Sequence, residues 1–188
     1  MVRFYIKSFI ILLIIGCSTN YSESSLDEKT VLTSKIDSII NQSENKSYND
    51  SIKFSYALKA MSLSEKKGID SLTIKSLFQL VKLSYPIKTK DSFLHYYPKS
   101  LSFSKQIGDT LHIAQIHNFT AFFYLKHNVI DSAYHHFYQG SKFFKFLGNN
   151  YQTGKMLLNM AIIQKNKRDY KGSEEVTNDA LKYLEKTD

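Results

Sequence analysis

Apolar residues recur at the spacing of one helix face along most of this chain, and short polar segments separate the runs. Two such runs follow each other within residues 108–147, and the first carries Leu111, Ile116, Phe119 and Phe123. Only 7 Gly and 2 Pro occur in 188 residues, so little interrupts the helices. The pattern predicts an all-α fold made of consecutive helix pairs.

A 40-residue period underlies this pattern. Gly68, Gly108 and Gly148 are spaced by 40, and such periods indicate stacked supersecondary units. We expect the three glycines to occupy equivalent corners between successive helix pairs. Small residues recur in phase with them, as expected where two helices cross closely. They are Ala60, Ser100, Gly140 and Ala180, then Ala121 and Ala161, then Ala133 and Ser173.

The unit that begins at Gly68 departs from this pattern. Val81 and Phe93 stand where the later units have small residues, which predicts looser or rearranged packing. Pro98 falls inside the helix expected from Asp91 to Ile107. Because proline removes a backbone donor and clashes with the preceding turn, we expect a kink or a break there.

Asp followed by Ser or Thr recurs where helices should begin. The carboxylate oxygens can accept hydrogen bonds from the free N–H groups of the first turn, so these residues are interpreted as N-caps. O-glycosylation of such triplets is the alternative. The pairs are Asp50-Ser51, Asp70-Ser71, Asp91-Ser92, Asp109-Thr110 and Asp131-Ser132.

The body of the chain resembles the tetratricopeptide (TPR) repeat family in a 40-residue form. The residues that carry the resemblance are Ala121, Ala133 and Gly140 in one unit, and Ala161, Ser173, Ala180 and the turn Asp169-Tyr170 in the next. The resemblance implies a TPR-like α-solenoid of about three and a half antiparallel helix pairs. A degenerate first pair would span residues 30–67, and three further pairs would span 68–107, 108–147 and 148–188.

The same resemblance implies a concave surface lined by the first helix of each pair. The family's groove positions, transferred to this chain, form a basic surface with aromatic and aliphatic patches. It would suit a protein or a peptide with acidic groups or a free C-terminal carboxylate. The alternative is that the lysines only solvate an exposed face. The positions are Lys75, Phe78 and Lys82; Gln115, Asn118, Phe122 and Lys126; and Lys155, Leu158, Ile162, Lys165 and Asn166.

The N-terminus has the order of a secretory leader over residues 1–16. Arg3 and Lys7 precede an apolar stretch that is too short to span a membrane. Ile14-Ile15-Gly16-Cys17 resembles the lipobox of bacterial lipoproteins, which implies that Cys17 is acylated and anchors the chain. Ser18 lacks the acidic side chain of inner-membrane retention, so the resemblance favours the outer membrane. An ordinary cleaved leader with a free cysteine is the alternative.

Residues 17–29 are rich in Ser, Asn and acidic groups, and we expect them to form a flexible tether. The formal charge of +8 is spread along the chain, so nucleic acid is not indicated as a partner. The single cysteine excludes an intramolecular disulfide. No catalytic or cofactor motif occurs, so we expect neither an enzyme nor a bound cofactor.

The histidines have spacings that do not predict a metal site. His112 and His117 are five residues apart, which does not place them on one helix face, and His135 and His136 are adjacent. Surface or interhelix positions explain them better. The leading hypothesis is therefore a lipid-anchored TPR scaffold of the cell envelope that binds a protein or peptide. The alternative is the extracytoplasmic sensor module of a membrane-bound signalling or transcriptional regulator.

Overall fold

The computed structural model describes residues 28–87 and 90–187, and these fold into eight helices joined by short turns. The predicted leader and Cys17 lie outside the described residues. The N-terminal helix is described from residue 28 to Glu44, so it includes two residues that the sequence assigned to the tether. The other seven are α2 (Asp50–Lys67), α3 (Asp70–Ile87), α4 (Lys90–Gln106), α5 (Thr110–Lys126), α6 (Ile130–Phe146), α7 (Asn150–Asn166) and α8 (Tyr170–Leu184).

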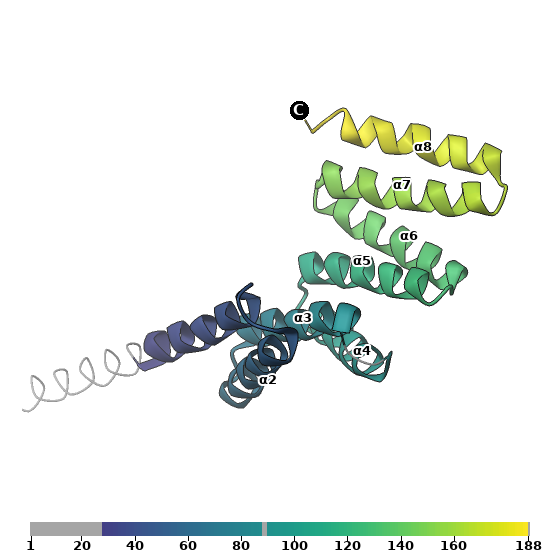
Figure 1. Ribbon diagram of the computed structural model, residues 1–188. Helices are drawn as coiled ribbons and strands as arrows, with labels where there is room; N and C mark the ends of the chain where they lie inside the picture. Colours follow the sequence, from purple (N-terminus) through teal and green to yellow (C-terminus); the bar gives the residue numbers. More distant parts are fainter. Residues whose placement is uncertain (1–27, 88–89, 188) are drawn as a thin grey trace, which may run out of the picture.

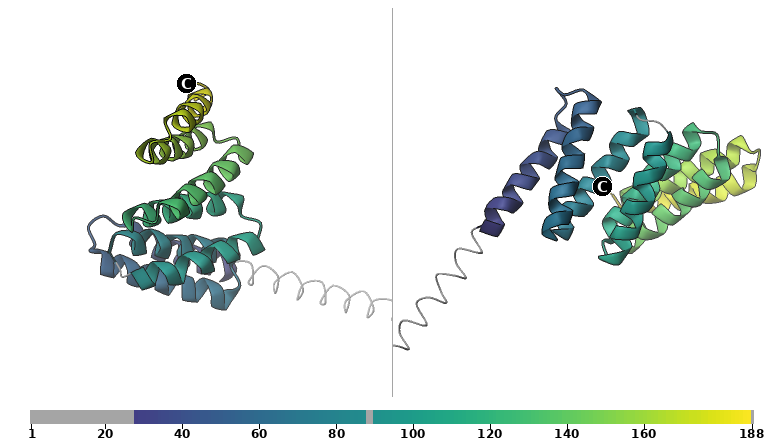
Figure 2. Two further views of the ribbon diagram at one scale, coloured as in Figure 1. Left: turned by 90° about the vertical axis from the view of Figure 1, so that its right-hand side faces the viewer. Right: turned by 90° about the horizontal axis from the view of Figure 1, so that it is seen from below.

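Consecutive helices pack against each other as antiparallel pairs, and the pairs stack in chain order. Figure 1 shows α5 to α8 piled one on the next, with α2 to α4 at the other end of the array. The right-hand view of Figure 2 shows the same succession from the N-terminal helix onward. The prediction of an all-α, TPR-like solenoid is confirmed, with four helix pairs in the described residues. None of the described helices is long and apolar enough to cross a bilayer.

The corners between pairs are built alike around the three glycines. Gly68, Gly108 and Gly148 have φ angles of 63°, 71° and 68°. At each corner the amide after the glycine donates to the carbonyl five residues earlier, at 2.9–3.0 Å. This is the hydrogen bond of a Schellman motif, which ends a helix through a left-handed residue. The expected equivalence of the three corners is therefore confirmed.

The corners within pairs use the same backbone geometry without glycine. Asn128 has a φ of 58° and Arg168 a φ of 66°. The following amides donate to Tyr124 and Gln164 at 2.9 and 3.0 Å. A left-handed residue thus recurs every 20 residues from 108 to 168. The sequence shows only the 40-residue period, because glycine marks every second corner.

The in-phase small residues lie where helices cross closely. Ala60, Ser100, Ala133 and Ala180 are fully buried. The hydroxyl of Ser173 donates to the carbonyl oxygen of Ala161 on the paired helix at 2.9 Å. A hydrogen bond to the main chain of a neighbouring helix requires the two backbones to be almost in contact.

The first full unit is rearranged rather than loosened. Val81 and Phe93 are both fully buried. The Phe93 ring of α4 stacks on the Phe123 ring of α5, with 4.0 Å between centroids and 5° between planes. The large side chain that replaces a small one therefore reaches into the next helix pair and fills the space there.

The cap assignments are right at one predicted position and wrong at others. Asp109 caps α5, accepting from the amide of His112. At α2 the cap is Asn49, one residue before the predicted Asp50. The helix α6 begins at Ile130 after Val129 and has no side-chain cap. Four of the predicted residues lie inside the first turn. There the carboxylate does not cap the helix but interacts favourably with the positive end of the helix dipole. These are Asp50, Asp70, Asp91 and Asp131.

Of the kink or break expected at Pro98, the break is wrong, because α4 runs without interruption from Lys90 to Gln106. Pro98 is exposed, and so is Leu94, whose carbonyl group loses its helical donor. Water can satisfy a carbonyl on this side of the helix, so the missing hydrogen bond does not end it.

The corner geometry predicts opposite effects for two substitutions. A Cβ at Gly148 would meet no atom within 4 Å, so Gly148→Ala adds only the strain of a left-handed alanine. Because alanine also restricts the unfolded chain, which offsets part of this strain, we expect a net decrease of about 1 kcal/mol in the free energy of unfolding. Arg168→Gly relieves that strain but adds freedom to the unfolded chain, so a net gain of up to about 1 kcal/mol is expected. Urea unfolding measures both, and effects of equal sign would contradict the corner assignment.

Candidate functional site

The first helices of the pairs line two hollows that join into one groove. A hollow of about 290 Å³ lies between the N-terminal helix, α3 and the start of α5. A second, of about 320 Å³, lies between α3, α5 and the start of α7. Both are lined by Phe78, Lys82, Leu111 and Gln115. We call the two hollows together the groove.

Aromatic rings form the middle of the groove. The Phe78 ring of α3 meets the rings of His112 and Phe119 on α5 edge to face, at centroid distances of 5.3 and 5.6 Å. The Lys82 ammonium lies 5.6 Å from the Phe78 centroid. Because edge-to-face contacts hold these rings in place, this part of the groove is preorganised.

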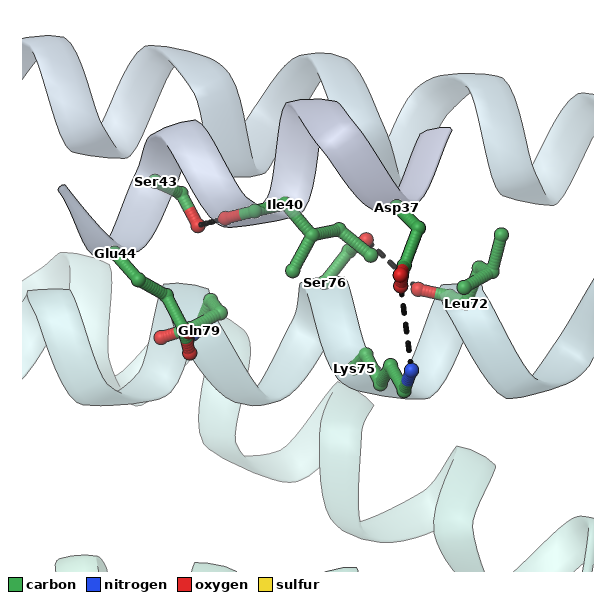
Figure 3. A network of polar contacts seen from close by, with 8 residues as sticks. All are labelled: Asp37, Ile40, Ser43, Glu44, Leu72, Lys75, Ser76 and Gln79. Carbon is green, nitrogen blue, oxygen red and sulfur yellow. Dashed lines mark hydrogen bonds and ion pairs between the residues drawn. The ribbon is translucent and has the colours of Figure 1, made fainter. Parts of the chain in front are cut away.

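Charges in the first hollow are balanced across it. Asp37 and Glu44 are seven residues apart on the N-terminal helix. They form ion pairs with Lys75 at 3.3 Å and with Lys82 at 3.7 Å, and these lysines are also seven apart on α3. Gln79 donates from its carboxamide to Glu44. Figure 3 shows Asp37 pointing at Lys75 and Glu44 beside Gln79.

These ion pairs modify the expectation that the groove is basic. Lys75 and Lys82 line the first hollow, but Asp37 and Glu44 of the N-terminal helix neutralise their charges. Solvent-exposed ion pairs of this kind contribute roughly 0–1 kcal/mol, so a partner's carboxylates could compete for the lysines. Asp37 and Glu44 were not among the predicted groove residues. Their seven-residue spacing, matched to that of the two lysines, is the signal that could have revealed them.

Carboxamides dominate the second hollow. Gln115 and Asn118, two of the residues selected from the sequence, line it together with Gln152 of α7. All three side chains are half-buried. None of their carboxamides makes a hydrogen bond to a described residue. Gln152 stands at the start of α7 and was missed, because the transferred positions on that helix begin at Lys155.

The predicted positions in the later half of α5 and all those on α7 do not line either hollow. Phe122 is half-buried and packs edge to face on Phe137 at 5.2 Å, in the interhelix core. The Lys126 ammonium donates to the Tyr85 carbonyl oxygen at 3.5 Å. Lys155 lies 5.2 Å from the centroid of Tyr151.

The remaining four lie farther along α7. Leu158 is half-buried, whereas Ile162 is 56% exposed, and Lys165 and Asn166 are exposed. Their role in binding stays a prediction.

A second polar feature is a histidine pair between α5 and α6. The Nδ1 atoms of His117 and His136 are 2.9 Å apart, so one neutral ring donates and the other accepts. Burial lowers the pKa of His117 to about 3, and repulsion from His136, Lys105 and His135 adds to this. Burial, with a smaller contribution from His135, lowers the pKa of His136 to about 4.

The position of His117 agrees with the interhelix role expected for these histidines. Close to the pair, burial raises the pKa of Tyr97 to about 12, and its hydrogen bond to Tyr124 acts in the same direction. Within residues 28–87 and 90–187, no group of three or more His, Cys, Asp or Glu side chains is placed to bind a metal ion.

Comparison with known proteins supports the fold. No family model matches the sequence, and no curated protein is significantly similar to it. Among solved structures, the chain is similar to the crystal structure of BtubC (BKLC) from P. vanneervenii, with a TM-score of 0.63 and 13% identity. The match covers 72% of this chain and 56% of that one. At this identity the similarity concerns the fold alone.

The histidine pair predicts a loss of stability in acid. Both histidines have pKa values in the folded protein that lie below the ordinary value of about 6.5. At pH values between 6.5 and the folded pKa values, the unfolded chain therefore binds more protons than the folded protein does. The stabilisation is complete above about pH 6.5 and declines as the pH falls toward 4 and then 3. Replacing both histidines, as His117→Leu with His136→Leu, should flatten this decline in urea unfolding at several pH values. Parallel pH profiles for the two proteins would contradict the prediction.

Proposed function

We propose that this chain is a protein-binding scaffold that holds a segment of a partner protein in the groove. The observation that carries the proposal is the continuity of the two hollows across the N-terminal helix, α3, α5 and α7. A groove that crosses several repeat units can contact many residues of an elongated partner, although each unit contributes few. The TPR-like fold supports the same conclusion, since binding proteins is the general use of this scaffold.

Acidic groups on the partner are part of the proposal, and free lysines near the far end of the array support it. Lys155 and Lys165 of α7 form no ion pair with any residue that the structure describes, and Lys126 contacts a carbonyl oxygen rather than a carboxylate. The lysines of α3, by contrast, are already paired. An acidic partner would therefore gain most from the positive charge on α5 and α7.

We further propose that the protein works in the cell envelope, held to a membrane by acyl chains on Cys17. The support is the order of charge, apolar stretch, Gly16 and cysteine in the sequence. Several acyl chains suffice for stable attachment, where one chain is marginal. The following polar residues would place the helical array at a distance from the lipid. The Ser18 side chain favours the outer membrane.

Photo-crosslinking in intact cells tests the binding proposal. Leu111 in the groove is 43% exposed, and Leu181 on α8 is 45% exposed, so the two positions are matched except for location. A photoreactive residue at 111 should give a small set of discrete protein adducts that the same residue at 181 does not give. Identical adducts from both positions, or no adduct from position 111, would contradict the binding proposal.

Mass spectrometry of the membrane fraction tests the anchor. We expect an N-terminal peptide that begins at acylated Cys17, and we expect Cys17→Ala to prevent both acylation and membrane retention. Recovery of the unaltered chain with a free thiol from the soluble fraction would refute anchoring while leaving the groove proposal intact.

A further inference from the structure

The end of α6 carries an apolar surface patch where the other second helices end in polar residues. Phe146, its last residue, is 80% exposed, and Leu147 beside it is 40% exposed. Phe146 and Phe143 also border a hollow of about 530 Å³, which shares no lining residue with the groove. Because the packing of the array does not require an apolar residue here, the patch indicates a contact with something else. The positions that correspond to Phe146 in the 40-residue period hold Lys66, Gln106 and Lys186.

Positive charge surrounds the patch. Lys142 and Lys145 flank it on α6. Neither forms an ion pair with a residue that the structure describes, and their ammonium groups lie over the rings of Tyr138 and Tyr183. We call Lys142, Lys145, Phe146 and Leu147 the basic corner.

The helices that meet at this corner lack negative charge. Between Asp131 and Asp169 the sequence contains no acidic residue. The cap of α7 is Asn149, whereas the corresponding cap of α5 is Asp109. The corner at Gly148 thus keeps the capping hydrogen bond without a carboxylate, so an anionic partner would meet no repulsion from the cap.

The basic corner lies at the edge of the array where the N-terminal helix begins. Because consecutive helices are antiparallel, the starts of the first helices and the ends of the second helices share one edge. Figure 1 shows the start of the N-terminal helix and the turn between α6 and α7 both at the left of the array. Only residues 18–27, ten in number, separate residue 28 from Cys17. An extended chain of ten residues spans at most about 36 Å, so an acylated Cys17 would keep this edge close to a bilayer.

An anionic lipid surface fits these features better than a second copy of the chain does. Two basic corners in contact would bring four lysines together, and like charges repel. Lysines that contact lipid phosphates beside an aromatic ring that enters the headgroup region are typical of binding at a membrane interface. An acidic protein would match the same charge, but the tether brings only the bilayer to this edge. A weak contact suffices, because the anchor makes it intramolecular.

We propose that the basic corner rests on an anionic lipid surface. Lys142 and Lys145 contact phosphate groups, and Phe146 and Leu147 enter the headgroup region. This inference rests on the proposed anchor at Cys17 and adds an orientation to it. The array stands on one edge at the membrane, and the edge with the turn between α5 and α6 points away from the lipid.

Spin labelling of the acylated full chain on vesicles tests this orientation. Cys17 is the only cysteine, so once it is acylated an introduced cysteine carries the label alone. Leu147→Cys marks the basic corner, and Val129→Cys, at a residue that is 42% exposed on the opposite edge, is the matched control. The vesicles contain phosphatidylcholine alone or equal parts of phosphatidylcholine and phosphatidylglycerol. On the anionic vesicles, access of a water-soluble nickel complex to position 147 should fall severalfold and access of oxygen should rise, whereas position 129 should stay aqueous.

Second substitutions in the protein labelled at position 147 identify the groups responsible. Phe146→Gln, which restores the residue type found at Gln106, should return the label to an aqueous environment. Lys142→Gln with Lys145→Gln should do the same. Lys46→Gln with Lys171→Gln removes two exposed lysines from the opposite edge and should leave the immersion unchanged. Thermal unfolding of every variant checks that it folds.

The outcomes separate this inference from the proposed anchor. A label at position 147 that stays aqueous on vesicle-bound protein, or that is immersed equally in both kinds of vesicle, would overturn the inference while the anchor stands. Protein that remains on neither kind of vesicle would refute the anchor and the inference together. A photoreactive residue at position 147 that crosslinks to protein rather than lipid in intact cells would identify an acidic protein as the occupant and also overturn the inference.

Discussion

The architecture depends on two helices of a pair approaching until their backbones nearly touch. The Ser173 hydroxyl reaches the Ala161 carbonyl directly, and a Cβ on Gly140 would already be in van der Waals contact with Ala114 and His117 of the paired helix. At such distances dispersion contacts are dense and larger side chains do not fit. The small residues repeat every 40 positions because every helix pair has the same close crossing.

Stacking of pairs follows from this local geometry and gives the groove its position. Buried clusters lie one after another along the array, the first around Ile36 and Ile40, the next around Phe93 and the last around Phe137. Each helix pair therefore needs only its neighbours, as in other repeat proteins. The first helices of the pairs share one side of the array, and the groove joins parts of four of them.

The sequence predicted the features that recur with the 40-residue period, and it missed features that occur at single positions. Gly108 marks a corner because glycine adopts positive φ without cost, whereas Arg168 adopts it under the constraint of the surrounding turn and carries no signal in the sequence. The sequence suggested a break at Pro98 because the order of residues alone does not show that Pro98 faces solvent. The pairing of Lys75 with Asp37 was missed for a similar reason, since the contact joins residues 38 apart on different helices.

The most direct test of the close crossing is the free energy of unfolding of Ala133→Leu, with Asn178→Leu on the exposed face of α8 as the control. Ala133 is fully buried at the crossing of α5 and α6. If the backbones are in near contact there, the larger side chain must force them apart and lower the free energy of unfolding by about 1–3 kcal/mol, and the control should change it little. An unchanged or raised value for Ala133→Leu would contradict the account.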